Sequence, residues 1–354
     1  MKLYSVYGKT TLLTFLTSVI VLAGVYAYVF FVQPPVANAG VQELSAGVID
    51  SESAKTSENV YTDDEKLHFV STASTSEYIW VPMPEGVKAT DVVIENHYMD
   101  AQLWIAIDCA DTEFYKKESI SGNLKDIAGG VISNSSGKTV LKLDMDHIYE
   151  YNTIFENGVL YIEKVAPAVM YDKIVIVDPA GNAPDNLLNA ESMKPSAICL
   201  DIAAKVKNIL EKKNIKVYVT SMDERVIDDQ SKLFLSSEIK PDMYIRIETA
   251  YDEDTKLYGT ETVYNGTYFI PGFGSVELAD LLEREVTTNI GGRVGGMSEA
   301  KPEDVVIQKA TVPAATVKIG YYTNLQENIL LNRDDYRSKI AQGIANAVNA
   351  GFDE

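Results

Sequence analysis

Histidine is scarce in this sequence and unevenly placed. The chain has 354 residues but only three histidines, His68, His97 and His147, so the second half contains none. A metal site there that needs two imidazole ligands would have to borrow them from the first half. This distribution restricts the metal and acid–base chemistry of the second half.

Cysteine and positive charge are also in short supply. The two cysteines, Cys109 and Cys199, lie far apart, which excludes a disulfide framework and a thiolate metal cluster. Lys and Arg number 31 against 51 for Asp and Glu, a formal charge of -20. A surface of this sign repels polyanions, so nucleic acid and anionic wall polymers are excluded as partners.

Charged residues are missing altogether from 10–32, which is apolar throughout. A helix of this length crosses a bilayer core of about 30 Å. Lys2 and Lys9 precede it and the next cation is Lys55, so the positive-inside rule predicts a cytoplasmic tail at 1–9 and the bulk of the chain outside. The alternative is a signal peptide cleaved near Ala39.

The remaining chain divides into a linker and two folded units. Residues 33–66 are rich in Ser, Glu, Asp and Ala and predict a flexible linker. Residues 67–166 alternate short β-branched or aromatic runs with turn residues, which predicts a small antiparallel sandwich or barrel with Trp80 and Trp104 in its core.

Residues 171–354 have a different pattern. A continuous apolar strand at 173–177 precedes a helix that opens at Pro195 and has apolar residues at helical spacing until Asn214. Further strands are predicted at 217–220, 243–247, 260–264 and 315–319, and helices at 225–238, 276–286 and 333–350. Strands that alternate with helices predict an α/β domain with a mostly parallel sheet flanked by helices.

Six short segments in this second unit resemble, in the right order, the zinc-dependent N-acetylmuramoyl-L-alanine amidases of the amidase-3 type, the cell-wall autolysins. They lie at 176–179, 200–203, 217–221, 240–245, 259–264 and 320–324. The resemblance implies a zinc ion held by two His and one Glu, with a further Glu as general base. It also implies peptidoglycan as the substrate class.

The positions that carry this chemistry in the family hold other residues here. The first ligand His falls on Gly181 and the ligand Glu on Pro195, with Glu191 four residues too early. The second His falls on Glu248, and the general base on Lys318. A cation at 318 repels zinc and accepts no proton while charged, so we expect a degenerate member with no metal, no cofactor and no catalytic residues.

We expect Glu248 and Lys318 to meet at the ends of adjacent strands and to form an ion pair, with Asp178 and Asn182 close by. The alternative is that both side chains point into solvent. Glu191 and Asn324 complete the predicted set of binding residues.

The function predicted is a membrane-tethered, non-catalytic protein on the outer face of a bacterial cell membrane. Its expected partner is a peptidoglycan peptide or a cell-envelope protein. One alternative is an active zinc N-acetylmuramoyl-L-alanine amidase that cleaves peptidoglycan with a relocated ligand set. Another is a structural assembly protein that acts through the β domain.

Overall fold

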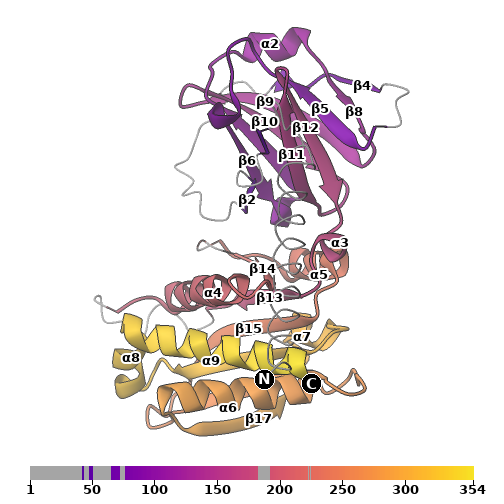
Figure 1. Cartoon of the computed structure of the whole chain (residues 1–354). Helices are drawn as coiled ribbons and strands as arrows, with labels where there is room; N and C mark the ends of the chain where they lie inside the picture. The colour runs from indigo at the N-terminus through magenta and orange to yellow at the C-terminus, as the bar shows by residue number, and fades with distance from the viewer. Residues whose placement is uncertain are drawn as a thin grey trace, which may run out of the picture.

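The computed structural model describes residues 42–43, 48–50, 65–71, 76–181, 192–221, 223 and 225–354. They form an all-β unit, which stands on an α/β unit (Figure 1). The predicted membrane segment at 10–32 lies outside the described residues. Among the helices that are described, none has the length and apolar character needed to span a bilayer.

The all-β unit is a sandwich of two six-stranded sheets, as the alternation predicts. Inward-pointing residues of both sheets, such as Ile79 and Leu141, form one buried cluster between them. The first sheet runs in the order β1 (Gln42–Glu43), β11 (Glu150–Glu156), β12 (Val159–Val165), β5 (Tyr78–Pro82), β8 (Ile120–Gly122) and β4 (Phe69–Ser71). The second runs β2 (Val48–Asp50), β6 (Val92–His97), β7 (Gln102–Ile107), β10 (Lys138–Met145), β9 (Ile127–Ser135) and β3 (Glu65–Lys66).

Two features of this unit differ from the expectations. The stretch predicted as a flexible linker contributes β1, β2 and β3, which pair with β11, β6 and β9 at the sheet margins. Trp80 and Trp104 are not in the core, because both point outward from their strands and stay half-buried. Trp104 instead stacks on His97, with ring centroids 3.9 Å apart.

The α/β unit is built on a six-stranded sheet in the order β14 (Lys216–Val219), β13 (Ile174–Pro179), β15 (Met243–Ala250), β18 (Ala314–Tyr321), β16 (Thr260–Tyr264) and β17 (Val294–Glu299). The first four strands are parallel, and β16 pairs antiparallel with β18. The mixed α/β fold is therefore confirmed, with one antiparallel pairing in a mostly parallel sheet.

Helices cover both faces of this sheet (Figure 1). One face packs on α4 (Pro195–Glu211), α6 (Ser275–Ile290) and α9 (Asp334–Asp353), and the other on α5 (Asp229–Ile239) and α7 (Val305–Lys309). The short helices α2 (Thr112–Lys117), α3 (Pro167–Met170) and α8 (Leu325–Leu331) lie outside these layers. The spacing of Ile198, Ile202 and Val206 buries one side of α4, and Pro195 occupies its first turn, as predicted.

The sequence patterns missed three elements near the end of the chain. They are β17, all of whose residues are exposed, and the short helices α7 and α8. Each lacks the run of periodic apolar residues on which pattern-based prediction depends.

The two units share a buried interface. Tyr98 and Ile148 of the β unit belong to the same hydrophobic cluster as Ile174 and Tyr218 of the α/β unit. The Tyr98 hydroxyl donates to Val219 O at 2.8 Å and accepts from Val219 N at 3.0 Å. The edge strand β14 is thus capped by a side chain from the β unit.

Buried charge reinforces this interface. The Glu150 carboxylate lies 3.1 Å from Lys216 Nζ and accepts a hydrogen bond from the Tyr218 hydroxyl. At the rim, His147 Nδ1 lies 2.8 Å from Glu238 Oε2. Because the buried acid and amine neutralise each other, separating the units would expose an apolar surface and leave two charges without their partners.

Replacing Tyr98 with Phe should lower the stability of the whole chain. The change leaves the N–H and C=O of Val219 without their hydroxyl partner, which we expect to cost about 1–3 kcal/mol. Denaturant unfolding should be followed by tryptophan fluorescence, which reports the β unit, and by circular dichroism of the helices. Both midpoints should fall. The control is Tyr78→Phe, at an outward-facing ring that meets Tyr161 edge-on, and equal effects of the two changes would contradict the prediction.

Candidate functional site

The carboxyl ends of three neighbouring parallel strands bring the predicted residues together. Asp178 is the last residue but one of β13, Glu248 lies in β15 and Lys318 lies in β18. The register pairs Asp178 with Arg246, and Glu248 with Lys318. In open α/β sheets this edge is where ligand sites form.

Asp178 is completely buried and has three polar partners. Its carboxylate lies 2.8 Å from Lys232 Nζ, which reaches it from α5, and accepts a hydrogen bond from the Thr220 hydroxyl. Arg246 Nε lies 3.8 Å from the other oxygen. A buried carboxylate is costly without such partners, and the nearby charges of Lys232 and Arg246 compensate that of Asp178.

Glu248 is paired with Arg246, which lies two residues earlier on the same face of β15. Arg246 Nε is 2.7 Å from Glu248 Oε1, a close ion pair although the N–H does not point at the oxygen. Burial raises the pKa of Glu248 above its usual value, and the charges of Arg246 and Lys318 offset part of this rise. The guanidinium of Arg246 therefore lies against both Glu248 and Asp178.

Glu248 and Lys318 are register partners on the adjacent strands β15 and β18. A direct contact between the carboxylate and the amine stays a prediction. Sequence reasoning missed Arg246 as the partner of Glu248. The signal was available, since residues i and i+2 of a strand share a face.

At Gly181 the backbone leaves no room for a side chain. A Cβ built there would lie 2.3 Å from both N and Cα of Ser196, in the first turn of α4. Pro195, where the family resemblance places a ligand Glu, is buried at the start of the same helix. A histidine at 181 would thus require α4 to move.

The other predicted binding residues do not join this cluster in the described part of the structure. Asn182 and Glu191 lie outside the described residues. Asn324 caps α8: its Oδ1 accepts from the backbone N–H groups of Gln326 and Glu327, and its Nδ2 donates to Thr255 O at 3.1 Å. Its side chain is committed to that turn.

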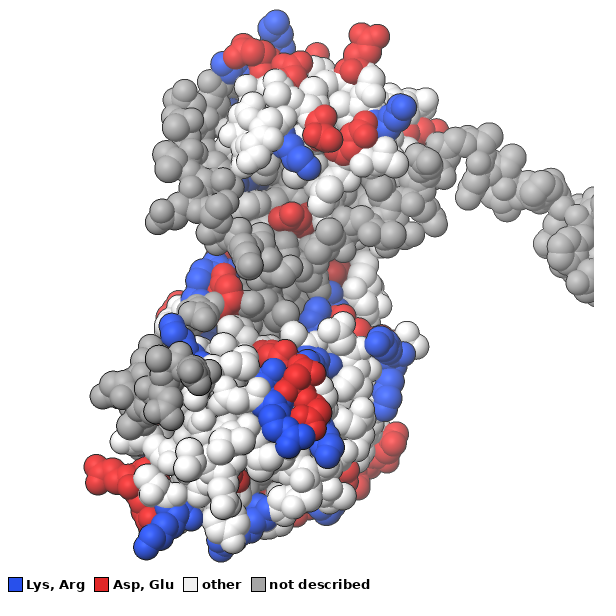
Figure 2. Space-filling model, turned by 90° about the vertical axis from the view of Figure 1, so that its left-hand side faces the viewer, with Lys and Arg blue, Asp and Glu red and all other residues white. Residues whose placement is uncertain are grey.

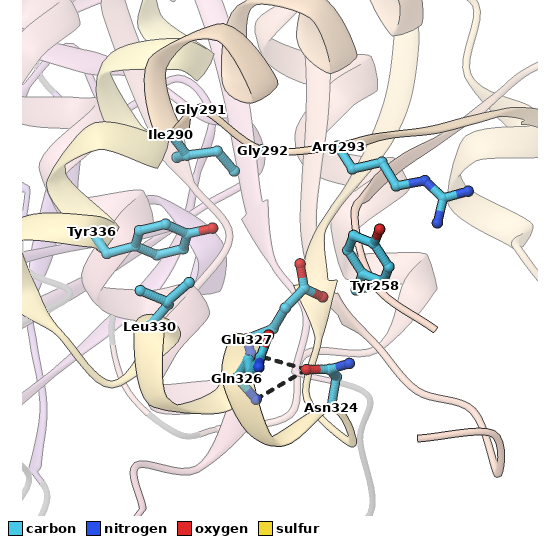
Figure 3. A pocket seen from close by; sticks show the side chains of 10 residues that line it. All are labelled: Tyr258, Ile290, Gly291, Gly292, Arg293, Asn324, Gln326, Glu327, Leu330 and Tyr336. Atoms are coloured by element: carbon cyan, nitrogen blue, oxygen red, sulfur yellow. Dashed lines mark hydrogen bonds between the residues drawn. The ribbon is translucent and has the colours of Figure 1, made fainter. Parts of the chain in front are cut away.

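Asn324 also lines a separate cavity of about 400 Å³ between the end of α6, α8 and the start of α9 (Figure 3). Leu330 and Tyr336 form one wall, and Arg293 packs over the ring of Tyr258 at 4.8 Å on the opposite side. Glu327, below the cavity, accepts from the backbone N–H groups of Gly259 and Tyr321. Most of the polar groups here serve to hold loops in place.

A zinc ion does not fit the residues at the carboxyl edge. Within the described ranges, no three His, Cys, Asp or Glu side chains converge as a group able to hold a metal. The carboxylates present, Asp178 and Glu248, already face the cations of Lys232 and Arg246. A divalent cation would have to displace these positive charges and would meet Lys318 as well.

The sheet with helices on both faces, and with polar side chains at the carboxyl ends of its parallel strands, defines an α/β domain with a candidate ligand site at that edge. Residues 175–350, just under half of the chain, match the family described as N-acetylmuramoyl-L-alanine amidase, so the α/β unit is similar to that family. The resemblance drawn from the six sequence segments is confirmed.

Named relatives match the same half of the chain. The germination-specific N-acetylmuramoyl-L-alanine amidase of Bacillus subtilis (strain 168) is 23% identical over 198 residues, which cover 51% of this chain and 81% of the relative. The probable cell wall amidase LytH of Staphylococcus saprophyticus is 25% identical over 188 residues, 52% of this chain and 60% of the relative. For LytC of B. subtilis the match spans 34% of the relative.

Solved structures match the same region. An N-acetylmuramoyl-L-alanine amidase from Clostridium difficile 630 is 24% identical with a TM-score of 0.46, covering 51% of this chain and 97% of that one. The CwlD amidase of Clostridioides difficile, solved in complex with the GerS lipoprotein, is 20% identical with a TM-score of 0.43, covering 51% and 98%. At these identities the likeness concerns the fold alone.

Replacing Arg246 with Met should destabilise the protein in a pH-dependent way. Near pH 7.5 we expect a loss of about 3 kcal/mol in the free energy of unfolding, because buried Glu248 loses its closest cation. The pKa of Glu248, already raised by burial, then rises further. A carboxyl whose folded pKa exceeds its unfolded pKa destabilises the fold only while ionised, so the loss should shrink as the pH falls toward about 5.

The matched control for this prediction is the double variant Arg246→Met/Glu248→Gln. It removes the acid together with its partner and should recover part of the stability lost near pH 7.5. Chemical denaturation at both pH values measures the effect. A loss that is the same at the two pH values would contradict the assignment of Glu248 as the uncompensated charge.

Replacing Gly181 with Ala should also be costly, by about 2 kcal/mol, since the new methyl group would overlap the backbone of Ser196. Gly129 offers the control, because a Cβ there has Asp144 Oδ2 at 3.9 Å as its nearest neighbour. Thermal unfolding of both variants measures the difference. If Gly181→Ala is as stable as the wild type, the position has room that the structure does not show.

Proposed function

We propose that this chain is a non-catalytic member of the amidase family that acts outside the bacterial cytoplasmic membrane. In this proposal, residues 10–32 anchor it in the membrane, and the α/β unit binds a peptidoglycan peptide or a cell-envelope protein. The alternative anchoring state is release by cleavage near Ala39. The β unit serves as an adaptor that holds the α/β unit away from the bilayer.

The observation that carries the proposal is the internal neutralisation of the carboxyl edge. Amide hydrolysis by a zinc enzyme needs a metal that polarises the carbonyl and lowers the pKa of water, and a base that accepts the proton. Here Arg246 lies against the two carboxylates, and position 318 holds a lysine. The backbone of Ser196 closes position 181. These three features together oppose the reaction.

The comparisons support an association with the cell wall. Two matched relatives carry the names of a germination-specific amidase and a probable cell wall amidase. The CwlD structure contains the GerS lipoprotein, which is a precedent for a protein partner on this fold. Fold alone does not determine function, so activity and partner have to be measured directly.

The distribution of surface charge suggests that the α/β unit binds its partner through local contacts and not through long-range electrostatic attraction. Figure 2 shows acidic and basic side chains side by side in a mixed cluster on the face of the α/β unit that is turned toward the viewer. On that face no broad field of one sign would gather a charged polymer. We therefore expect binding through shape and local pairs.

The direct test combines metal analysis with an assay on peptidoglycan. The purified full-length chain should contain less than about a tenth of an equivalent of zinc and release no peptides with a free N-terminal L-alanine from purified sacculi, because the residues at the carboxyl edge favour neither metal nor proton transfer. The germination-specific amidase of B. subtilis serves as the positive control. Stoichiometric zinc, together with peptide release that a chelator abolishes, would establish an active amidase and overturn the proposal.

A further inference from the structure

The two edge strands of the α/β sheet differ in whether their outward backbone groups have hydrogen-bond partners. The strand order places β14 at one edge and β17 at the other. An edge strand presents unpaired N–H and C=O groups that can pair with another chain, so natural proteins cover or block such edges.

The β14 edge is closed by side chains. Lys216 N donates to Lys173 O and Thr220 N to Val177 O, so residues 216, 218 and 220 face β13 and the alternate residues face outward. Of these outward groups, Val217 O accepts from Lys207 Nζ at 3.0 Å, and both groups of Val219 are bonded to the Tyr98 hydroxyl. Three of the four outward groups of Val217 and Val219 are thus bonded to side chains.

The β17 edge is open in the described structure. Ala300 N donates to Tyr264 O, so by the same alternation Met297 and Glu299 direct their backbone groups away from β16. Within the described ranges, no backbone or side-chain partner is bonded to these outward groups. Next to the bulge, the N–H of Gly296 donates to Glu283 at 2.6 Å, and the backbone of Gly295 also bonds to this carboxylate.

β17 has a bulge between Val294 and Gly296, but the stretch from Met297 to Glu299 pairs regularly with β16. All six of its residues are exposed, with Val294 57% and Met297 41% accessible, and the strand contains neither Lys nor Pro. Gly295 and Gly296 carry no side chains that would hold an approaching strand away. The edge is therefore a ready template for an added strand.

Charge decides which kind of strand fits. The carboxylates of Asp280 and Glu261 lie close enough to Glu283 to raise its pKa together with burial, and Glu299 adds a further acid on the strand itself. Arg284 is paired with Asp280 at 3.0 Å, and Lys318 lies opposite Glu261 in register, so Glu283 and Glu299 remain as the acids beside Met297. Arg293 and Lys301 follow the two ends of the strand in the sequence. A second copy of this chain, with its charge of -20, would be repelled.

We propose that β17 is a docking site for an extended, cationic segment of a partner protein, which adds to the sheet as a seventh strand beside Met297 and Glu299. Main-chain hydrogen bonds to these two residues hold the segment, and its basic side chains face the surrounding acids. The inference does not depend on whether the α/β unit is catalytic, because the edge lies in a strand that contributes no residue to the carboxyl-edge cluster.

The test uses the full-length chain and two labelled, end-capped octapeptides, one alternating Lys with Val and one alternating Glu with Val. Fluorescence anisotropy should show the Lys/Val peptide binding at least about tenfold more tightly, because only its charge complements the edge. Hydrogen exchange should show slower exchange of the Met297 and Glu299 amides in the presence of that peptide.

Two variants separate main-chain pairing from side-chain contact. Met297→Pro removes an outward N–H that the sheet itself does not use and should weaken binding by about tenfold or more. Met297→Ala keeps the N–H and should stay within about threefold of the wild type. Circular dichroism confirms that both variants are folded.

Three outcomes would overturn the proposal. They are equal binding of the two peptides, unchanged exchange at Met297 and Glu299, and light scattering that shows a dimer of this chain which Met297→Pro dissociates. The last result would assign the edge to a second copy. Loss of peptide binding in Met297→Pro with full retention in Met297→Ala would support the proposal, whatever the zinc and peptidoglycan assays show.

Discussion

The guanidinium of Arg246 is the group on which the interior of the α/β unit depends. It lies between two buried carboxylates, Asp178 and Glu248, on a part of the sheet that water does not reach freely. In a low-dielectric interior, two like charges cannot stay ionised unless a cation compensates them. Lys232, from α5, supplies the second positive charge and ties that helix to the carboxyl end of β13.

This arrangement explains how charged residues can be buried at the carboxyl edge of an apolar sheet. The core of the sheet is apolar and close-packed, and it tolerates new residues at the strand ends as long as their charges balance. Here the charge of Arg246 lies close to the carboxylates of Glu248 and Asp178. Gly181 lies against the backbone of Ser196, in the first turn of α4.

The β unit also supplies partners for polar groups of the α/β unit. Tyr98 closes one edge of the α/β sheet, and Glu150 neutralises Lys216 beside it. The two units consequently behave as one packed body around a shared apolar cluster. The opposite edge, β17, has no such cover among the described residues. An uncovered edge strand can pair with a strand of another protein.

The sequence by itself determined the α/β fold, because continuous apolar strands and the periodic apolar face of α4 or α9 encode burial locally. The order of the motifs in the sequence also showed which residues align with the functional positions of the family, namely Gly181, Pro195, Glu248 and Lys318. Only the tertiary structure decided that Glu248 pairs with Arg246, that Lys232 reaches Asp178 and that Tyr98 caps Val219. Those contacts join residues from different elements, and their geometry depends on how the helices and the β unit pack on the sheet. Local sequence patterns do not predict how these elements pack against one another.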